Sequence, residues 1–507
     1  MRLPKAVRVP ARPPWRALGL AMLIGVGTAT GQAPLGWWWG TLLSLSVLTW
    51  LLARQARQSH AVWLAWFAGA GQFGAAMYWI VDPFLVDPAR DGWMAPFALL
   101  LLSFGLALFW ALAAGVGHWL GRGPRSRALG FAVALAGADL MRSYVLTGFP
   151  WGLIGHVWVG TWAAQADIFL GPVGLSLMTT LAAALPLAVG RIRGTAASTL
   201  LLGAAMVFGA WRVQQPIPPR AHPIEVRLVQ PNATQDLKWS TRWQRIFWDR
   251  MLDDTAAPTK PGAPPLDLIV WPETSAPFLL NDPGPGLRII RDAAHGVPVA
   301  FGVQRGADGR YYNSLAVMNA EGRIETVYDK WHLVPFGEYI PFGDVLAKVG
   351  ITAFAAQLGN GFTPGVGARI LDLGPKIGKV LPLICYEAIF PQDLRAAPGR
   401  ANWILQVTND AWFGTFAGPY QHLAQTRLRA IEEGLPFLRA ANTGVSAVID
   451  PYGRVVASLP LNKAGYLDAA VPGALAEPPY SRWGDGPVLA LILAGLAGIG
   501  WAARRRT

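Results

Sequence analysis

The sequence predicts a membrane-embedded base of eight transmembrane α-helices that carries an α/β domain with a mixed sheet. The chain of 507 residues is 53% hydrophobic, only 14% charged and contains 24 Trp, a composition typical of membrane spans with aromatic residues at their ends. Between residues 212 and 486, short β-rich runs alternate with helical patterns, which indicates an α/β fold. The predicted domains are therefore residues 1–211 with seven transmembrane helices, 212–486 with the α/β domain, and 487–507 with a last helix and a basic tail.

Eight apolar runs mark the predicted spans. They lie near residues 16–31, 36–53, 62–81, 94–120, 128–146, 166–189, 195–211 and 487–503. Several approach the roughly 20 residues that cross a bilayer, which disfavours the alternative of buried helices in a soluble core. The fifth run contains Asp139 and Arg142. Because charges in lipid must pair or face a cavity, we expect an i,i+3 ion pair there.

The distribution of Lys and Arg predicts the orientation in the membrane. Fifteen basic residues lie in the N-terminal tail, in alternate loops and at the C-terminus: Arg2, Lys5, Arg8, Arg12, Arg16, Arg54, Arg57, Arg122, Arg125, Arg127, Arg191, Arg193, Arg504, Arg505 and Arg506. The intervening loops are nearly free of them. Since cytoplasmic loops are enriched in Lys and Arg, we expect a multi-pass protein of the bacterial inner membrane with both termini cytoplasmic and a periplasmic α/β domain.

The net charge of +13 does not indicate a nucleic-acid partner. Residues 212–485 hold 26 Lys and Arg against 25 Asp and Glu, a net charge of +1. A nucleic-acid-binding domain would concentrate the basic residues on its own surface.

The α/β domain follows a Pro-rich linker at 215–219. Strands are predicted where β-branched and aromatic residues gather between turn signals, and helices where the apolar period is 3.6 residues. The predicted strands are 224–230, 266–271, 299–303, 314–319, 323–328, 379–384, 403–408, 446–449 and 455–459, and the predicted helices are 240–255, 285–294 and 419–434. The segment 335–367 is long, irregular and rich in Phe and Tyr, and such loops are commonly binding loops.

Three chemically distinct residues each follow one of these strands. Glu273 follows 266–271, Lys330 follows 323–328, and Cys385, the single cysteine of the chain, follows 379–384. Strand ends can converge at one edge of a sheet, where α/β proteins build their sites. A thiol, a carboxylate and an ammonium together supply a nucleophile, a base and an oxyanion stabiliser. Taken alone, each residue also has a structural explanation: a buried small hydrophobe, a turn cap and a solvated lysine.

The remaining polar residues give no metal-site pattern. The seven His are scattered without metal-ligand spacing, so neither a metal nor a cofactor is predicted. A single Cys allows no internal disulfide. In an oxidising outer compartment a lone thiol is at risk of oxidation, which favours a chemical role for Cys385.

The motifs around the three residues resemble a known family. Trp271–Glu273, Tyr328–Glu338 and Ile384–Glu387 resemble the Glu–Lys–Cys signature of the nitrilase superfamily. With seven predicted spans before them and one after, they resemble its membrane-bound branch, the apolipoprotein N-acyltransferases of Gram-negative bacteria. The resemblance covers essentially the full length and implies an αββα sandwich on a membrane base.

The resemblance also implies a reaction and a set of site residues. The family transfers an acyl chain from a phospholipid, typically phosphatidylethanolamine, to the α-amino group of a lipoprotein's N-terminal diacylglyceryl-cysteine. It implies a ping-pong mechanism with a thioester on Cys385, Glu273 as base, and Lys330 and the Tyr386 backbone N–H as oxyanion partners. The supporting residues that it implies are Glu338 beside Lys330, Tyr386 and Glu387 beside the nucleophile, and Trp239 at the substrate.

Two other functions remain open from the sequence. A membrane-anchored amidase or nitrilase would hydrolyse a C–N bond with the same three residues, and only the acceptor, water instead of an amine, would differ. A transporter with an accessory domain would require several ionisable residues within the spans. Only Asp139 and Arg142 meet that description, which disfavours the transporter.

The predicted orientation can be tested with reporter fusions that are active only outside the cytoplasm. A fusion near Pro216 should be active, because it follows the seventh span, whereas fusions after Arg193 or at Thr507 should be inactive. The opposite pattern of activities would invert the topology and contradict a periplasmic α/β domain.

Overall fold

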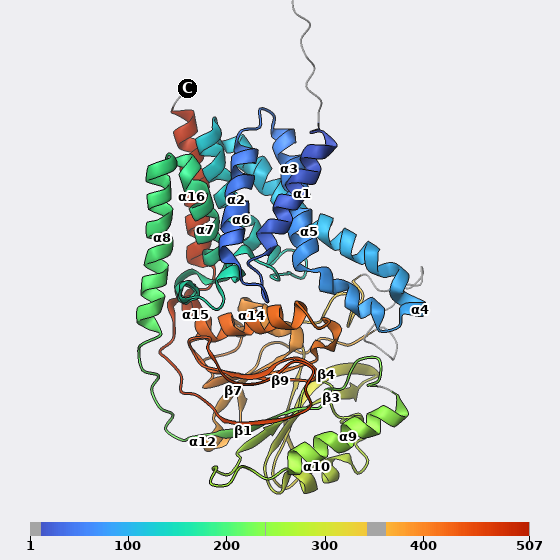
Figure 1. Cartoon of the computed structure of the whole chain (residues 1–507). Coiled ribbons are helices and arrows are strands. Elements are labelled where there is room, and N and C mark those ends of the chain that lie inside the picture. Colours follow the sequence, from blue (N-terminus) through green and yellow to red (C-terminus); the bar gives the residue numbers. More distant parts are fainter. Residues whose placement is uncertain (1–11, 239, 342–360, 506–507) are drawn as a thin grey trace, which may run out of the picture.

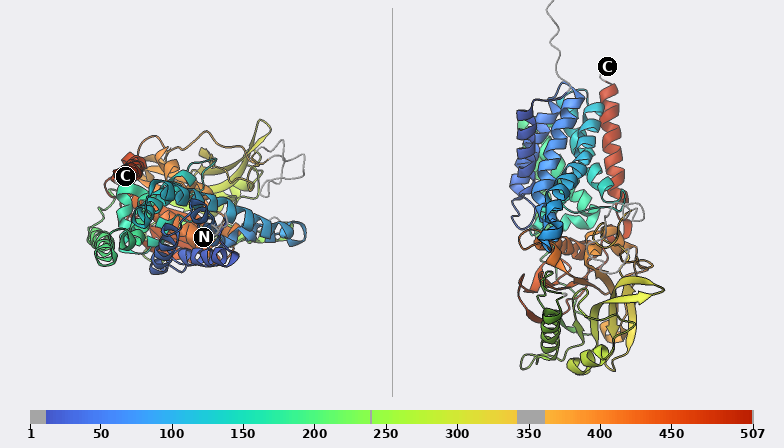
Figure 2. Two further views of the ribbon diagram at one scale, coloured as in Figure 1. Left: turned by 90° about the horizontal axis from the view of Figure 1, so that it is seen from above. Right: turned by 90° about the vertical axis from the view of Figure 1, so that its right-hand side faces the viewer.

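A helical bundle stands on a domain built around two β-sheets (Figure 1). The structure is a computed structural model and describes residues 12–238, 240–341 and 361–505. Trp239 and most of the aromatic segment 335–367 therefore lie outside the described residues. Figure 2 shows the bundle and the sheets stacked along one axis.

All eight apolar runs form helices of the bundle. These are α1 (Trp15–Ala29), α2 (Trp38–Ala53), α3 (Gln58–Ala76), α5 (Ala95–Leu120), α6 (Pro124–Arg142), α7 (Asp167–Ala188), α8 (Arg191–Arg212) and α16 (Gly486–Arg504). Within the described residues, four helical stretches are long and apolar enough to cross a membrane: Pro88–Leu120, Trp162–Ala188, Arg191–Arg212 and Gly486–Arg504. The helices α1 and α2 are apolar but shorter, with 15 and 16 residues. These apolar helices indicate a membrane protein, and four of the helical stretches are long enough to span the bilayer.

Glycine permits the close packing of α1 on α3. A Cβ atom at Gly25 would lie 1.8 Å from the carbonyl oxygen of Ala68, and one at Gly71 would lie 2.0 Å from that of Met22. Small residues at such contacts let helix backbones approach closely, as is usual in membrane bundles.

The predicted Asp139–Arg142 pair is present in α6. The guanidinium Nη2 lies 3.3 Å from Asp139 Oδ1, and both side chains are buried. Arg142 also donates to the carbonyl of Trp151 at 2.8 Å, and Asp139 Oδ2 accepts from Ile154 N–H and the Ser176 hydroxyl. The pair therefore fixes the irregular segment at the end of the bundle that faces the sheets.

The sheet-containing part is a four-layer αββα sandwich. One six-stranded sheet has the order β12-β1-β2-β3-β4-β5 and the other β11-β10-β9-β8-β7-β6. In each sheet three central strands are parallel (β1, β2, β3 and β7, β8, β9) and the outer strands are antiparallel. The strands are β1 (Glu225–Gln230), β2 (Leu268–Val270), β3 (Val299–Ala307), β4 (Arg310–Met318), β5 (Ile324–Asp329), β6 (Leu371–Asp372), β7 (Lys379–Ile384), β8 (Trp403–Thr408), β9 (Phe437–Ala441), β10 (Ser446–Ile449), β11 (Val455–Leu459) and β12 (Gly465–Ala470).

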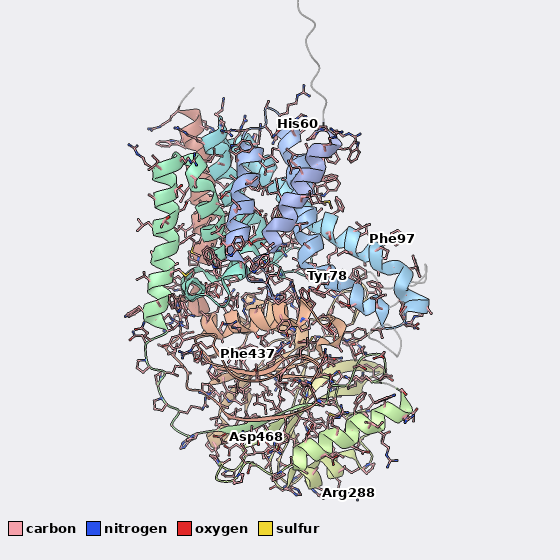
Figure 3. All side chains as sticks on the ribbon, viewed as in Figure 1. His60, Tyr78, Phe97, Arg288, Phe437 and Asp468 are labelled. Atoms are coloured by element: carbon pink, nitrogen blue, oxygen red, sulfur yellow. The ribbon has the colours of Figure 1, made fainter. Side chains whose placement is uncertain are left out.

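Three helices cover the outer faces of the two sheets. The helices α9 (Thr241–Ala256) and α10 (Gly286–Ala294) pack on the first sheet, with Met251 and Ile290 in that core. The helix α14 (Gly418–Glu433) packs on the second sheet, where Ala430 meets Phe437, and Figure 3 shows Phe437 below this helix. Apolar residues of both inner faces meet between the sheets.

Short helical turns connect these elements. They are η1 (Tyr78–Leu85), α4 (Pro88–Asp91), η2 (Gly92–Met94), η3 (Ile154–Trp158), η4 (Trp162–Ala166), α12 (Gly374–Ile377), η6 (Cys385–Ile389), α13 (Pro391–Arg395), η7 (Asp410–Trp412) and α15 (Pro479–Trp483).

The predicted strands and helices are all present, but three strands were not predicted. The edge strand β6 has two residues and β12 contains an Asp, so neither shows a clear alternating pattern. The central strand β9, Phe-Leu-Arg-Ala-Ala, follows Gly434 and Pro436 and contains Arg439. Fully buried strands ordinarily appear in a sequence as continuous apolar runs, and the charged residue interrupts that run.

The bundle and the sandwich meet at α14, and Gln421 is the main polar contact. Its Oε1 accepts from the indole N–H of Trp79 at 3.1 Å and of Trp151 at 2.7 Å. Its Nε2 donates to the carbonyls of Ala33 at 3.2 Å and Ala76 at 2.9 Å. All four hydrogen-bonding positions of this amide are filled by the bundle side, which fixes α14 against the bundle.

From the buried Asp139–Arg142 pair we predict that substituting Asp139 destabilises the protein far more than substituting the exposed Asp87. Asp139→Ala should lower the unfolding free energy by about 3–5 kcal/mol, because it leaves Arg142 buried and unpaired. Asp87→Ala should cost at most about 1 kcal/mol, since Asp87 is half exposed and 4.0 Å from Arg90. Thermal unfolding of the detergent-solubilised variants measures both, and equal melting temperatures would contradict the structural role of the buried pair.

Candidate active site

Cys385 lies at a sharp strand-to-helix turn. The strand β7 ends at Ile384, and the 3₁₀ turn η6 begins at Cys385. Cys385 has φ of +51°, a conformation that costs a non-glycine residue about 1–3 kcal/mol and persists only where the surroundings enforce it. The residue is 5% exposed. The turn thus presents a nearly buried thiol at the end of a central strand.

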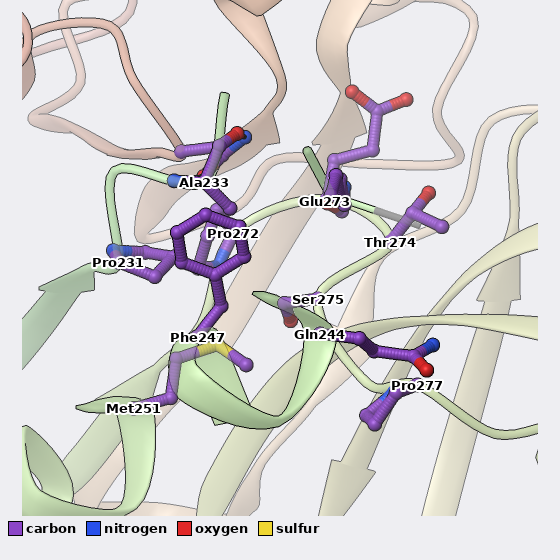
Figure 4. Close-up of a pocket in the computed structure, with 12 residues that line it drawn as sticks. Pro231, Ala233, Gln244, Phe247, Met251, Pro272, Glu273, Thr274, Ser275 and Pro277 are labelled. Atoms are coloured by element: carbon purple, nitrogen blue, oxygen red, sulfur yellow. Dashed lines mark hydrogen bonds between the residues drawn. The ribbon is translucent and has the colours of Figure 1, made fainter. Parts of the chain in front are cut away.

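Glu273 follows β2 in the opposite sheet, and both of its carboxylate oxygens accept hydrogen bonds. Oε1 accepts from Asn313 Nδ2 at 2.7 Å, and Oε2 accepts from the Asn409 backbone N–H at 2.8 Å. Figure 4 shows this carboxylate pointing away from the small pocket below it, which is lined by Phe247 and Met251. The two donors orient the carboxylate into the space between the sheets.

Lys330 follows β5, whose two antiparallel pairings make it run parallel to β3. Its Nζ lies 2.8 Å from Glu338 Oε2 and 3.6 Å from Glu273 Oε1, and it is 1% exposed. Burial alone would lower its pKa, but Glu338, Glu273 and Cys385 raise that pKa above the ordinary value. Lys330 is therefore a fixed ammonium at the site.

The thiol of Cys385 is uncharged at neutral pH. Burial and the neighbouring Glu273 raise its pKa, and Lys330 opposes them only in part. Thr408 also opposes the rise of this pKa. Because the thiolate is the reactive form of cysteine, a reaction at this thiol would require a base. Glu273 is the carboxylate that could take the proton.

Glu387 links the segment of Lys330 to the turn of Cys385. Its Oε1 accepts from the Tyr328 hydroxyl at 2.9 Å and from Trp331 N–H at 2.8 Å, and its Oε2 accepts from Ile384 N–H at 2.7 Å. It is fully buried, and this burial, offset by the backbone donors, raises its pKa to about 7. These contacts favour a positioning role for Glu387 over contact with a substrate.

Two of the other predicted supporting residues, Glu338 and Tyr386, lie in the described part of the chain. Glu338 contacts both Lys330 and Asn313. Tyr386 packs edge-on against Phe390 and His332 on the side of the bundle. Trp239 lies outside the described residues.

Two asparagines at the site were not predicted. Asn409 follows β8, the neighbour of β7, so its position at the end of a predicted strand could have indicated a site residue. Asn313 lies within β4, where the sequence gives no such signal. Its amide donates to both Glu273 and Glu338 and so holds two carboxylates around one lysine.

His332 connects the site to the bundle. Its Nδ1 lies 2.7 Å from Asp393, its Nε2 lies 3.0 Å from the Thr147 carbonyl, and the ring stacks on Phe390. Its ring contacts are thus with Asp393, Thr147 and Phe390 rather than with the three residues of the site. Within the described part of the chain, no group of three or more His, Cys, Asp or Glu could hold a metal ion.

A thiol, a carboxylate and an ammonium meet between two facing sheets, and this part of the chain belongs to the class of carbon–nitrogen hydrolases. Residues 225–479 match the carbon–nitrogen hydrolase family, and residues 24–185 match the apolipoprotein N-acyltransferase N-terminal domain. The crystal structure of a carbon–nitrogen hydrolase from Helicobacter pylori G27 is similar at 19% identity, with a TM-score of 0.37 over 53% of this chain and 95% of that one.

Curated relatives match nearly the whole chain. An apolipoprotein N-acyltransferase of Caulobacter vibrioides is 40% identical over 95% of this chain and 93% of its own length. One of Brucella melitensis is 36% identical over 97% of both chains. The chain belongs to the apolipoprotein N-acyltransferase family.

From the contacts of Glu387 we predict that its replacement by glutamine displaces Cys385. Glu387→Gln places an amide nitrogen against a backbone N–H or the Tyr328 hydroxyl, so one anchor is lost. The alkylation of Cys385 by iodoacetamide should slow about tenfold, since misplacement of a reacting group by about 1 Å has effects of this size or more. The exposed Glu321 is the matched control: Glu321→Gln should react like the wild type, and equal rates for both variants would contradict the positioning role.

Proposed function

We propose that this protein transfers a fatty acyl chain from a phospholipid to the α-amino group of the N-terminal diacylglyceryl-cysteine of apolipoproteins. The observation that carries the proposal is the buried cluster of Cys385, Lys330 and Glu273 in a chain whose relatives are named apolipoprotein N-acyltransferases. The donor class is a phospholipid, with phosphatidylethanolamine as the proposed species.

In the first half-reaction, Glu273 takes the proton of the Cys385 thiol while the sulfur attacks the ester carbonyl of the phospholipid. Lys330 and the Tyr386 backbone N–H stabilise the oxyanion of the tetrahedral intermediate. When the intermediate collapses, Glu273 returns its proton to the leaving alkoxide. A lysophospholipid departs, and the acyl chain remains on Cys385 as a thioester.

In the second half-reaction, the lipoprotein amine attacks the thioester carbonyl. Glu273 takes a proton from the amine, the same two donors stabilise the oxyanion, and the C–S bond breaks. The proton passes to the sulfur, so the product amide leaves and the thiol of Cys385 is restored. A thioester is a reactive acyl donor and an amide is stable, so this step runs downhill.

Four residues support these steps. Glu338 keeps Lys330 charged and in place, as their 2.8 Å contact indicates. Glu387 joins the Lys330 segment to the Cys385 turn. Tyr386 flanks the nucleophile and shapes the acceptor pocket, and Trp239 contacts the substrate.

The membrane arrangement is part of the proposal. All eight bundle helices span the inner membrane, residues 212–486 form the periplasmic catalytic domain, and residues 1–211 and 487–507 supply the spans. In support, α1 begins and α16 ends at the end of the bundle away from the sheets (Figure 1), as cytoplasmic termini with a periplasmic domain require.

Hydrolysis of a C–N bond by the same residues is less well supported. The relatives that match nearly the full length are named acyltransferases, and the N-terminal half matches a domain of that family. A hydrolase acting on a small substrate would have no need of the apolar base.

Intact-mass analysis of protein purified from membranes tests the proposal. The wild type should carry a fatty-acyl mass that hydroxylamine removes, and Cys385→Ala should carry none. Glu273→Gln should form no thioester, and Lys330→Met should form it about 10²–10³ times more slowly, as for loss of an oxyanion donor. Adding a diacylglyceryl-peptide should then discharge the thioester as an amide.

The outcomes separate the two enzyme functions. A thioester on Cys385→Ala, or near-normal rates in Glu273→Gln, would refute the assigned roles. Discharge by water with no amide product would instead support the hydrolase. Arg288→Met, at an exposed residue of α10, is the control for loss of a positive charge and should retain the wild-type rate.

A further inference from the structure

A buried polar cluster lies directly behind the nucleophile and contacts its backbone. The cluster consists of Gln406 on β8, Asp410 just after β8, His422 on α14 and Arg439 on β9, all with 0% exposure. Gln406 Nε2 donates to the carbonyl oxygen of Cys385 at 3.0 Å. None of these four side chains has a part in the acyl transfer described above.

The contacts of the cluster determine which atoms donate. Arg439 Nη1 donates to Gln406 Oε1 at 2.6 Å, which fixes the amide so that its nitrogen faces Cys385. Arg439 Nη2 also donates to Asp410 Oδ2. Arg439 and His422 overcome the effect of burial and lower the pKa of Asp410 to about 2, so this group is a carboxylate.

His422 completes the cluster as a neutral imidazole. Its Nδ1 lies 3.0 Å from the Asp410 carboxylate, and we assign the ring hydrogen to this nitrogen. Its Nε2 lies 3.1 Å from the donor Gln406 Nε2 and 3.2 Å from the carbonyl oxygen of Cys385. With Nε2 unprotonated, one amide hydrogen of Gln406 reaches His422 and the other reaches the Cys385 carbonyl. Burial and Arg439 lower the pKa of His422, in agreement with the neutral form.

We infer that Gln406 and His422 are positioning residues that hold the Cys385 carbonyl and thereby keep the nucleophile in its left-handed conformation. The unfavourable φ of Cys385 needs an enforcing contact, and the Gln406 amide supplies it at the carbonyl that follows the strained bond. The imidazole in turn packs against Trp151 of the bundle side, 5.5 Å between ring centres, and neighbours Gln421. The inference rests on the proposed function only for the identity of Cys385 as nucleophile.

Two readouts and four variants test this inference on the full-length protein. Because Cys385 is the single cysteine of the chain, its alkylation by iodoacetamide reports on the thiol alone. The second readout is the rate of acyl-enzyme formation as a function of phospholipid concentration. The variants are Gln406→Met, His422→Leu, His422→Gln and, as a matched control, Gln425→Met, which removes a buried amide from the same helix as His422. Thermal unfolding establishes that each variant is folded.

Gln406→Met and His422→Leu should slow alkylation and maximal acylation about 10- to 100-fold, with the phospholipid KM unchanged within about twofold, because orientation rather than binding is lost. His422→Gln can still donate to Asp410 and accept from Gln406, so it should retain most of the rate. Gln425→Met should react like the wild type.

Wild-type rates in folded Gln406→Met, or equal losses in Gln406→Met and Gln425→Met, would overturn the inference. A loss in His422→Gln as large as in His422→Leu would also overturn it, since His422 would then act through proton transfer. If the wild type forms no phospholipid-derived adduct but the alkylation rates follow the expected order, the proposed function fails and the positioning role stands.

Discussion

The contact of one buried ammonium with two carboxylates is the constraint on which the site depends. Lys330 is 1% exposed and lies between Glu338 and Glu273. An unpaired ammonium at this depth would be strongly destabilising, and the two carboxylates prevent this. With both glutamates as carboxylates and Cys385 as a thiol, the cluster carries one net negative charge. In the proposed mechanism, transfer of the thiol proton to Glu273 leaves that total unchanged, so the attack creates no new charge in a poorly solvated site.

This charge balance explains why the raised pKa of Cys385 is compatible with catalysis. A thiol that ionised in the resting state would add a second negative charge beside Glu273, and burial and that carboxylate oppose it. The proton transfer can instead accompany the attack, when the negative charge moves onto the carbonyl oxygen near Lys330. Preorganised donors act most strongly at the position where charge develops. A resting thiol is also less open to oxidation than a thiolate.

The sequence was sufficient for the parts of the site that follow from strand ends. Glu273, Lys330 and Cys385 each follow a predicted strand, and the observed parallel relations between β2, β3 and β5 and between β7 and β8 bring these ends together. Asn313 and the cluster around Arg439 could not be predicted, because their roles arise from contacts between segments far apart in the chain. The strand β9 was not predicted because it contains Arg439. A charge in a buried strand is explained only by its partners, which here are Asp410 and Gln406.

The contacts between bundle and sandwich indicate that the two parts hold one site jointly. The amide of Gln421 is saturated by two indoles and two carbonyls of the bundle side, and the next residue, His422, belongs to the cluster behind Cys385. His332, two residues after Lys330, reaches the carbonyl of Thr147 at the end of the bundle. Lys330 is thus two residues from an anchor on the membrane base, and the carbonyl of Cys385 contacts His422, the residue next to the other anchor. For a phospholipid substrate, whose ester lies at the level of the headgroups, such anchoring keeps the reacting groups at a constant height above the bilayer, which a flexible tether to the same base would not achieve.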